Sequence, residues 1–432
     1  MGTIDAFQRL VWSPQFKQNC FPHRSKMGVL KSFPKDKSAG RRRITKDGAR
    51  HSMRKQIMFK KTLAAVAVLG AFAGSAFAAN VTMYGIIDTG LGYTSTDKGY
   101  GEDVNKFDMR SGQNSSNRFG VKGEEDLGNG VKVGFSLENG FSSDDGKLST
   151  ADRLFDREAL LYVAGDFGEL GMGRQGDLAS GNGRYGLFGG KVSPFSTGWS
   201  DIAGHKYVMG AGFGRMDNSV TYKTPTFAGF NVLAQYSFKK DSAKEGREGS
   251  SAVDRQYALG ASFTVGDLYL TGIVTQTNLQ SLGEQDVEDP LTVSLGGNYN
   301  FGVAKLYVAT QYFKDSDLSV KQIDRRDAES NATGCQKASQ FDGFGLSVGA
   351  DVPAFGGTAK VLVGYMDAED QSTAAQDVQR YTFSVGYEYP LSKRTFVYGG
   401  AGYYMDSYDK VDVGHDDKAS VAAVNAGLVH KF

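Results

Sequence analysis

Apolar and polar residues alternate in a long series of segments that run to the end of the chain. In "VTMYGIIDTGLGY", Val81, Met83 and Ile87 share one parity, whereas Tyr84 and Asp88 share the other. The same period recurs in "FNVLAQYSF" and in "QRYTFSVGYEY". A period of two places alternate side chains on opposite faces of a β-strand. The pattern therefore predicts an all-β protein.

Connections of two kinds separate these segments. The short ones include "EDLGNG" and "PLSKR". The long ones lie near residues 94–114, 142–152, 175–217, 239–254, 278–289, 314–340, 368–377 and 405–418. Roughly sixteen strands, with short turns at one end and long loops at the other, indicate a 16-stranded antiparallel transmembrane β-barrel. Closure of such a barrel satisfies every backbone hydrogen bond within lipid.

The segment before the first strand has the pattern of a signal peptide. Residues 58–78, "MFKKTLAAVAVLGAFAGSAFA", combine two lysines, a short apolar stretch and small residues at the cleavage site. We therefore expect residues 79–432 to form the barrel and residues 1–57 to be an upstream extension, from a mis-called start or of non-native origin. Its tract "GRRRITK" resembles a basic nucleic-acid patch, but we expect no nucleic-acid partner.

Charge is divided unevenly between these parts. Residues 1–78 carry 16 of the 49 basic and 3 of the 48 acidic residues. The expected mature chain therefore has a net charge of −12, although the whole chain has +1. The acidic balance favours cations at the mouth of a pore.

The chain ends in an aromatic residue on the apolar parity. In "NAGLVHKF", Leu428, His430 and Phe432 share one face. In a barrel, this face would contact lipid, with the terminal ring in the aromatic girdle at the interface. An edge strand of a soluble sandwich is the alternative, and the signal peptide disfavours it.

The chain offers few residues for catalysis or for a cofactor. The expected mature part has a single cysteine, Cys335, and three histidines, His205, His415 and His430. Neither a disulfide framework nor a zinc site is predicted. "GMGRQG" fits a dinucleotide pattern, but the glycine-rich stretch after it cannot form the required helix. We expect no cofactor and no enzymatic activity, because no strand histidine has lumen parity.

Several segments resemble the trimeric general-diffusion porins of Gram-negative bacteria, in the betaproteobacterial and neisserial branch. They are "SNRFGVKGEEDLGNGVKVGFSLENGF", "LFDREALLYVAGDFGELGMGRQ", "RMDNSVTYKTPTFAGF", "GYEYPLSKRTFVY" and "GLVHKF". The resemblance implies an outer-membrane homotrimer for passive diffusion of small hydrophilic solutes and ions. It also implies a third loop, near 175–214, folded into the lumen. Phe432 would be the signal for the barrel-assembly machinery, and membrane lipid and lipopolysaccharide would be partners.

The resemblance assigns a constriction to arginines of the wall facing the third loop. The matching positions are Arg118, Arg157 and Arg215, with Arg174 as a further candidate. Asp177 and Asp201 are the loop's only acidic residues. By strand parity, we also expect four charged residues to line and hydrate the pore wall: Asp88, Lys122, Lys132 and Glu138.

Some features depart from the family pattern and leave choices open. The third loop lacks the family's Pro-Glu-Phe-Gly element, and Val429 stands where many members carry arginine. The arginines favour anions at the narrowest point, so weak anion preference is our expectation. A substrate-specific channel and a surface-binding barrel with function in loops 314–340 and 405–418 remain the alternatives.

Overall fold

The computed structural model describes most of the region expected to form the barrel. The described residues are 80–99, 101–181, 183–200, 204–279, 288–321, 323, 340–371, 377–409 and 416–432. The expectations for segments 1–57 and 58–78, and for Asp201, Cys335 and His415, lie outside the described residues.

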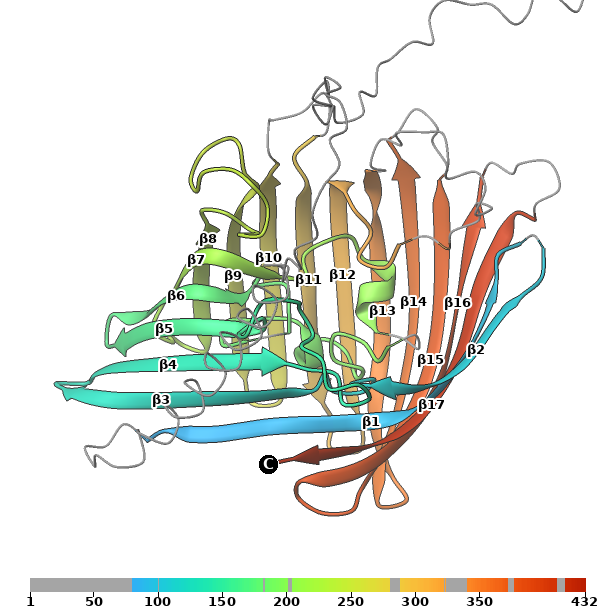
Figure 1. Cartoon of the computed structure of the whole chain (residues 1–432), viewed down its shortest axis with the longest axis horizontal. Coiled ribbons are helices and arrows are strands. Elements are labelled where there is room, and N and C mark those ends of the chain that lie inside the picture. The colour runs from blue at the N-terminus through green and yellow to red at the C-terminus, as the bar shows by residue number, and fades with distance from the viewer. Residues whose placement is uncertain are drawn as a thin grey trace, which may run out of the picture. The chain divides into compact units, whose positions relative to one another are not determined.

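The strands form one antiparallel sheet that closes on itself (Figure 1). The last strand pairs with the first along a register that runs from Ile86↔Lys431 to Asp97↔Ser420. The strands are β1 (Thr82–Asp97), β2 (Val104–Ser111), β3 (Arg118–Gly128), β4 (Val131–Gly140), β5 (Glu158–Gly165), β6 (Gly168–Gly176), β7 (Arg215–Lys223), β8 (Phe230–Ser237), β9 (Arg255–Val265), β10 (Leu268–Asn278), β11 (Leu291–Asn300), β12 (Lys305–Ser316), β13 (Phe341–Ala354), β14 (Gly357–Asp370), β15 (Val378–Pro390), β16 (Thr395–Tyr408) and β17 (Lys418–Lys431).

The prediction of sixteen strands in the wall is confirmed, although the described residues form seventeen strand segments. β1 pairs with β3 through Thr82–Ile86 and with β2 through Thr89–Thr96, so β2 and β3 share one place beside β1. The expectation of a long loop over 94–114 is wrong. There, the exposed Phe107 and Met109 alternate with charged residues and continue the outward face, a short pattern that the surrounding polar residues obscure.

The two faces of the wall differ as the alternation requires. Large apolar side chains such as Leu161 and Phe383 are exposed on the outside. Small polar side chains such as Thr221, Gln311 and Ser384 are buried on the inside. An apolar outer face is the condition for a barrel in lipid, where a lysine or arginine at mid-bilayer depth costs about 2–4 kcal/mol.

The short turns match the residues that the sequence places there. Between β3 and β4, Gly128, Asn129 and Gly130 all have positive φ, at 85°, 52° and 75°. Glycine and asparagine adopt this conformation with little strain, so "LGNG" forms a tight hairpin.

Helical structure among the described residues is limited to short 3₁₀ turns. η2 (Gly189–Lys191) and η3 (His205–Val208) both lie in the connection between β6 and β7. No helix in the described part of the chain is long and apolar enough to cross a bilayer.

Candidate functional site

The connection between β6 and β7, the third loop, lies inside the barrel (Figure 1). It is attached to the inner face of the wall, where the Tyr269 hydroxyl on β10 donates to the Leu187 carbonyl at 2.9 Å. Further along, the Ser200 backbone N–H donates to the Gln113 carbonyl near the start of β3 at 3.0 Å. The loop then returns to its origin, where the Asp177 N–H donates to the Gly214 carbonyl at 3.2 Å. A segment fixed at these points narrows the lumen.

Glycines on the inner wall make room for this loop. A Cβ added at Gly345 would lie 1.4 Å from the carbonyl oxygen of Val208, and one at Gly400 would lie 3.0 Å from the Trp199 ring. The wall glycines at which an added Cβ would meet the loop are Gly171, Gly260, Gly296, Gly345, Gly349, Gly364, Gly386 and Gly400. We call this set the glycine track. It gives a physical reason for the many glycines on the strands.

Aromatic side chains of the loop pack on the wall beside this track. The Trp199 ring lies 5.4 Å from that of Tyr398 on β16 and 5.1 Å from that of Phe195, both edge to face. Val429 of β17 belongs to the same buried cluster. An apolar side chain therefore suits this position of the wall.

A second connection also enters the barrel. The start of the segment between β12 and β13 forms a bridge between Gly210 and Leu318, and Leu318 is buried. Arg380 of β15 holds both connections. Its guanidinium donates to the carbonyls of Tyr207, Val320 and Lys321 at 3.1, 2.8 and 3.0 Å. The sequence analysis missed this role, and only the lumen parity of Arg380 pointed to it.

Three of the predicted constriction arginines lie together. Arg118, Arg157 and Arg215 stand near the starts of β3, β5 and β7 and interact electrostatically with one another. Arg157 Nε donates to Glu138 Oε1 at 2.6 Å, whereas Arg118 is 4.0 Å from the same carboxylate. Arg157 is therefore neutralised more directly than the other two arginines.

Glu138 was expected only to hydrate the wall, but it lies within this cluster. It also accepts a hydrogen bond from the Tyr84 hydroxyl at 3.0 Å. Glu158 of β5 lies opposite Glu138 of β4 in the strand register. It accepts a hydrogen bond from the Arg184 backbone N–H of the third loop at 3.1 Å. Glu158 was not predicted, because its neighbours in the chain do not show that the loop passes it.

The structure separates Arg174 from this cluster. Arg174 shares its strand face with the exposed Met172 and donates to Asp217 at 2.5 Å. Arg153 donates to both oxygens of the same carboxylate, at 2.7 and 2.9 Å. Arg174 thus joins an ion-pair network with the segment between β4 and β5.

Asp177 does not face an open pore. It is 1% exposed, and its Oδ2 accepts from the Gly214 N–H at 3.0 Å. Burial raises the pKa of Asp177 to about 7, although the positive charges of Lys240 and Arg215 oppose this shift. Asp177 therefore closes the base of the third loop instead of presenting a permanent negative charge to the arginines.

The other expected wall residues divide into anchors and exposed charges. Asp88 is fully buried and accepts from the Tyr398 hydroxyl at 2.8 Å, so its expected role in hydrating the wall is wrong. Lys122 is exposed beside the Tyr84 ring. Lys132 is exposed and pairs with Glu124 at 2.9 Å.

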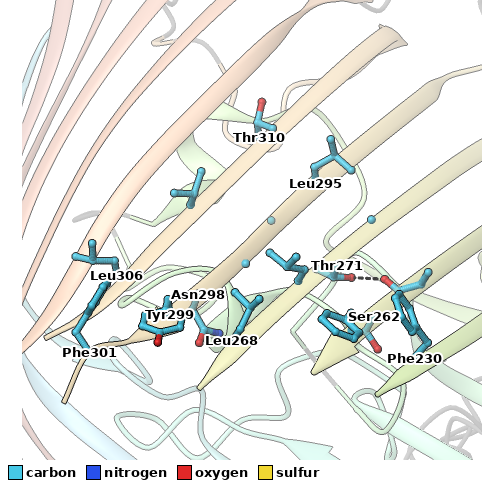
Figure 2. A pocket seen from close by; sticks show the side chains of 17 residues that line it. Phe230, Ser262, Leu268, Thr271, Leu295, Asn298, Tyr299, Phe301, Leu306 and Thr310 are labelled. Carbon is cyan, nitrogen blue, oxygen red and sulfur yellow. Dashed lines mark hydrogen bonds between the residues drawn. The ribbon is translucent and has the colours of Figure 1, made fainter. Parts of the chain in front are cut away.

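A large apolar groove lies on the outer face and has no part in the constriction (Figure 2). It has a volume of about 850 Å³ and includes the exposed side chains of Phe230, Leu295, Tyr299 and Phe301. These belong to the outward parity of β8 and β11 and to the turn after β11, so the groove faces lipid.

Comparisons with known proteins agree with this architecture. The sequence profile of the Gram-negative porin family matches residues 64–409. An outer membrane porin of Bordetella pertussis is 33% identical, over 86% of this chain and 100% of that protein. Outer membrane porin protein 32 of Delftia acidovorans is 31% identical, over 86% and 100%. The solved anion-selective porin from Comamonas acidovorans has 26% identity and a TM-score of 0.57, and covers 82% of this chain and 100% of its own.

Proposed function

Because the chain belongs to the Gram-negative porin family, we propose that its channel weakly favours anions at a constriction controlled by Arg118, Arg157 and Arg215. As an outer-membrane porin, it forms a water-filled pore for passive diffusion of small hydrophilic solutes and ions. Size and charge are filtered where the third loop narrows this pore.

The imbalance of charge at the constriction carries the proposal. Arg118 lies 4.0 Å from Glu138, and Arg215 has no ion pair within 4.0 Å among the described residues. The one described carboxylate of the third loop, that of Asp177, is buried and therefore does not offset these arginines. Charges that line a narrow aqueous pore select permeating ions by sign. The anion selectivity stated for the Comamonas relative supports the same direction.

Replacing the arginines tests the proposal. We expect the combined Arg118→Gln, Arg157→Gln and Arg215→Gln variant to shift the reversal potential in a salt gradient toward cations, because Glu138 then stays without its cationic neighbours. Arg394→Gln, in the exposed turn between β15 and β16, is the matched control. An unchanged potential in a folded variant would show that the cluster is structural.

We also propose that the chain assembles as a homotrimer. The outer face exposes apolar side chains around the wall, including Met83, Leu91 and Phe107 on β1 and β2, and so offers a surface to other chains as well as to lipid. Chemical cross-linking of the purified protein should yield a limiting species of three chains, and a limiting dimer or monomer would contradict the proposal.

The segment just before the barrel would serve export, and the C-terminal residue would serve assembly. We propose cleavage after Ala78 and recognition of Phe432 by the assembly machinery. The Phe432 backbone exchanges hydrogen bonds of 3.1 Å with Gly85 in both directions, and its ring covers Gly85. Phe432→Ala should lower the amount of folded protein in the outer membrane several-fold. Undiminished insertion would remove the role assigned to the ring.

We infer a channel without a catalytic function. His205 of the third loop is buried, and burial lowers its pKa to about 3. A histidine so reluctant to take a proton is a poor general base at neutral pH. Hydrolysis of ester substrates by the purified porin would contradict this inference.

A further inference from the structure

A second group of cations lies inside the barrel below the third loop. A cavity of about 490 Å³ is lined by Arg184 and Lys191 of the loop, Lys223 at the end of β7 and Lys305 at the start of β12. Asp267, in the turn between β9 and β10, is its only lining carboxylate among the described residues. Because the short turns face the periplasm, we call this cavity the periplasmic cationic pocket.

Two hydrogen bonds fix the third loop over this pocket. The Asn298 side-chain amide donates to the Lys191 carbonyl at 2.7 Å. The Tyr269 hydroxyl donates to the Leu187 carbonyl at 2.9 Å. Asn231 and Asn300 add further amide groups to the lining. The pocket is therefore built between a held loop and the wall of β7–β12.

The charges in the pocket are only partly compensated. Arg184 is paired with Glu169 at 2.8 Å and stacks 3.6 Å from the centre of the Tyr162 ring. For the three lysines, no ion pair within 4.0 Å occurs among the described residues. Lys191 donates to the Gly186 carbonyl at 3.0 Å and is repelled electrostatically by Lys223.

Lys305 lies over the Tyr307 ring at 5.1 Å, which leaves its charge in place. Lys223 and Glu169 attract each other electrostatically but form no close ion pair, because Glu169 is hydrogen-bonded to Arg184. With the Arg184–Glu169 pair set aside, the lining holds three lysines and one carboxylate, an excess of two positive charges. Like charges held together in this way favour a counter-anion.

We propose that the periplasmic cationic pocket binds small phosphate-bearing solutes that have passed the constriction. Lysine ammonium groups bind phosphate as compact point charges, and the asparagine amides donate to its remaining oxygens. The excess of two positive charges matches a dianion, and the volume exceeds that of inorganic phosphate, which leaves room for an organic substituent. This inference rests on the proposed passage of anions, and it names a solute class for the same channel.

Inorganic phosphate is the probe for a test in planar bilayers. With the purified full-length mature porin, phosphate should reduce the chloride current through single channels with saturation. In the combined Lys191→Gln, Lys223→Gln and Lys305→Gln variant, the half-blocking concentration should rise by about tenfold or more, which corresponds to about 1.4 kcal/mol. Lys393→Gln, in the exposed turn between β15 and β16, should block as the unmodified porin does.

The remaining outcomes separate this inference from the proposed ion preference. If phosphate did not reduce the chloride current of the unmodified porin, the proposal that the pocket binds phosphate would be wrong, and no variant would be needed to show it. Equal block by a dicarboxylate would overturn selectivity for phosphate. Ion preference is measured separately, in potassium chloride without phosphate. A reversal potential that shows cation preference, together with an unchanged block by phosphate, would contradict the proposed role of the constriction arginines. It would not contradict phosphate binding in the pocket.

Discussion

At the scale of single residues, Arg380 is the most heavily bonded cation of the described channel. It is fully buried, forms an ion pair with Asp406 at 2.6 Å and donates to backbone carbonyls of two inserted connections. Removing one partner of a buried ion pair costs roughly 3–5 kcal/mol, because the other charge stays buried alone. Arg380 thus ties the stability of the wall to the position of the segments that narrow the pore.

We therefore expect Arg380→Met to lower the thermal unfolding temperature of the purified porin and to make single-channel currents noisier. Adding Asp406→Leu should restore much of the thermal stability, because no unpaired charge then stays buried at this site. The current noise should stay high, because the backbone carbonyls still lack their donor. Arg394→Met is the matched control at an exposed turn. Unaltered current noise in Arg380→Met would show that the arginine does not hold the inserted segments.

The arginine cluster shows what the sequence could and could not predict for single residues. The matching motifs placed Arg118, Arg157 and Arg215, and the structure brings these three together. Strand parity gave the side on which Asp88 lies but not its burial under Tyr398. Parity states which way a side chain points, whereas its partners come from distant strands and loops.

At the scale of elements, the glycine track and the third loop are complementary. Gly399 and Gly400 are neighbours on β16 but face opposite sides of the wall. A Cβ at Gly400 would lie 2.9 Å from the Val385 carbonyl and 3.0 Å from Trp199, whereas one at Gly399 would meet only the Asn425 carbonyl, at 3.7 Å. Substitutions at these two glycines therefore separate the effect of the loop's close approach from the effect of the new residue's strand propensity.

We expect Gly400→Val to push Trp199 away from the wall and into the lumen, at a cost of about 1–3 kcal/mol for overpacking. Single-channel conductance should fall, and the currents should become noisier. Gly399→Val adds the same side chain on the lipid face and should leave conductance unchanged. Equal conductance in the two variants would mean that the glycine track does not set the position of the loop.

The strands and tight turns could be predicted because their signals are local. Alternation predicted the wall, and "LGNG" predicted the hairpin at Gly128–Gly130. β2 and the inward turn at Leu318 could not be predicted in the same way. Their apolar positions are few, and each of these segments is held in place by a contact with β1 or with the third loop. The glycine track was visible only as an abundance of glycine, without the loop that explains it.

At the scale of the whole molecule, two charge distributions compete. The expected mature chain has a net charge of −12, whereas the barrel interior holds the cluster of Arg118, Arg157 and Arg215 and a cavity lined by three lysines. Distant exposed charges are screened beyond about 8 Å at physiological salt. The field at the narrowest point should therefore decide selectivity, and the acidic balance of the chain should have a smaller effect.

The reversal potential of the unmodified mature porin in a planar bilayer under a potassium chloride gradient tests this account most directly. Stepwise conductance with a potential whose sign shows a modest preference for anions is the predicted result, because we propose that Arg118 and Arg215 control the constriction. A cation-signed potential from folded, conducting channels would contradict the account and assign control of selectivity to the acidic loops.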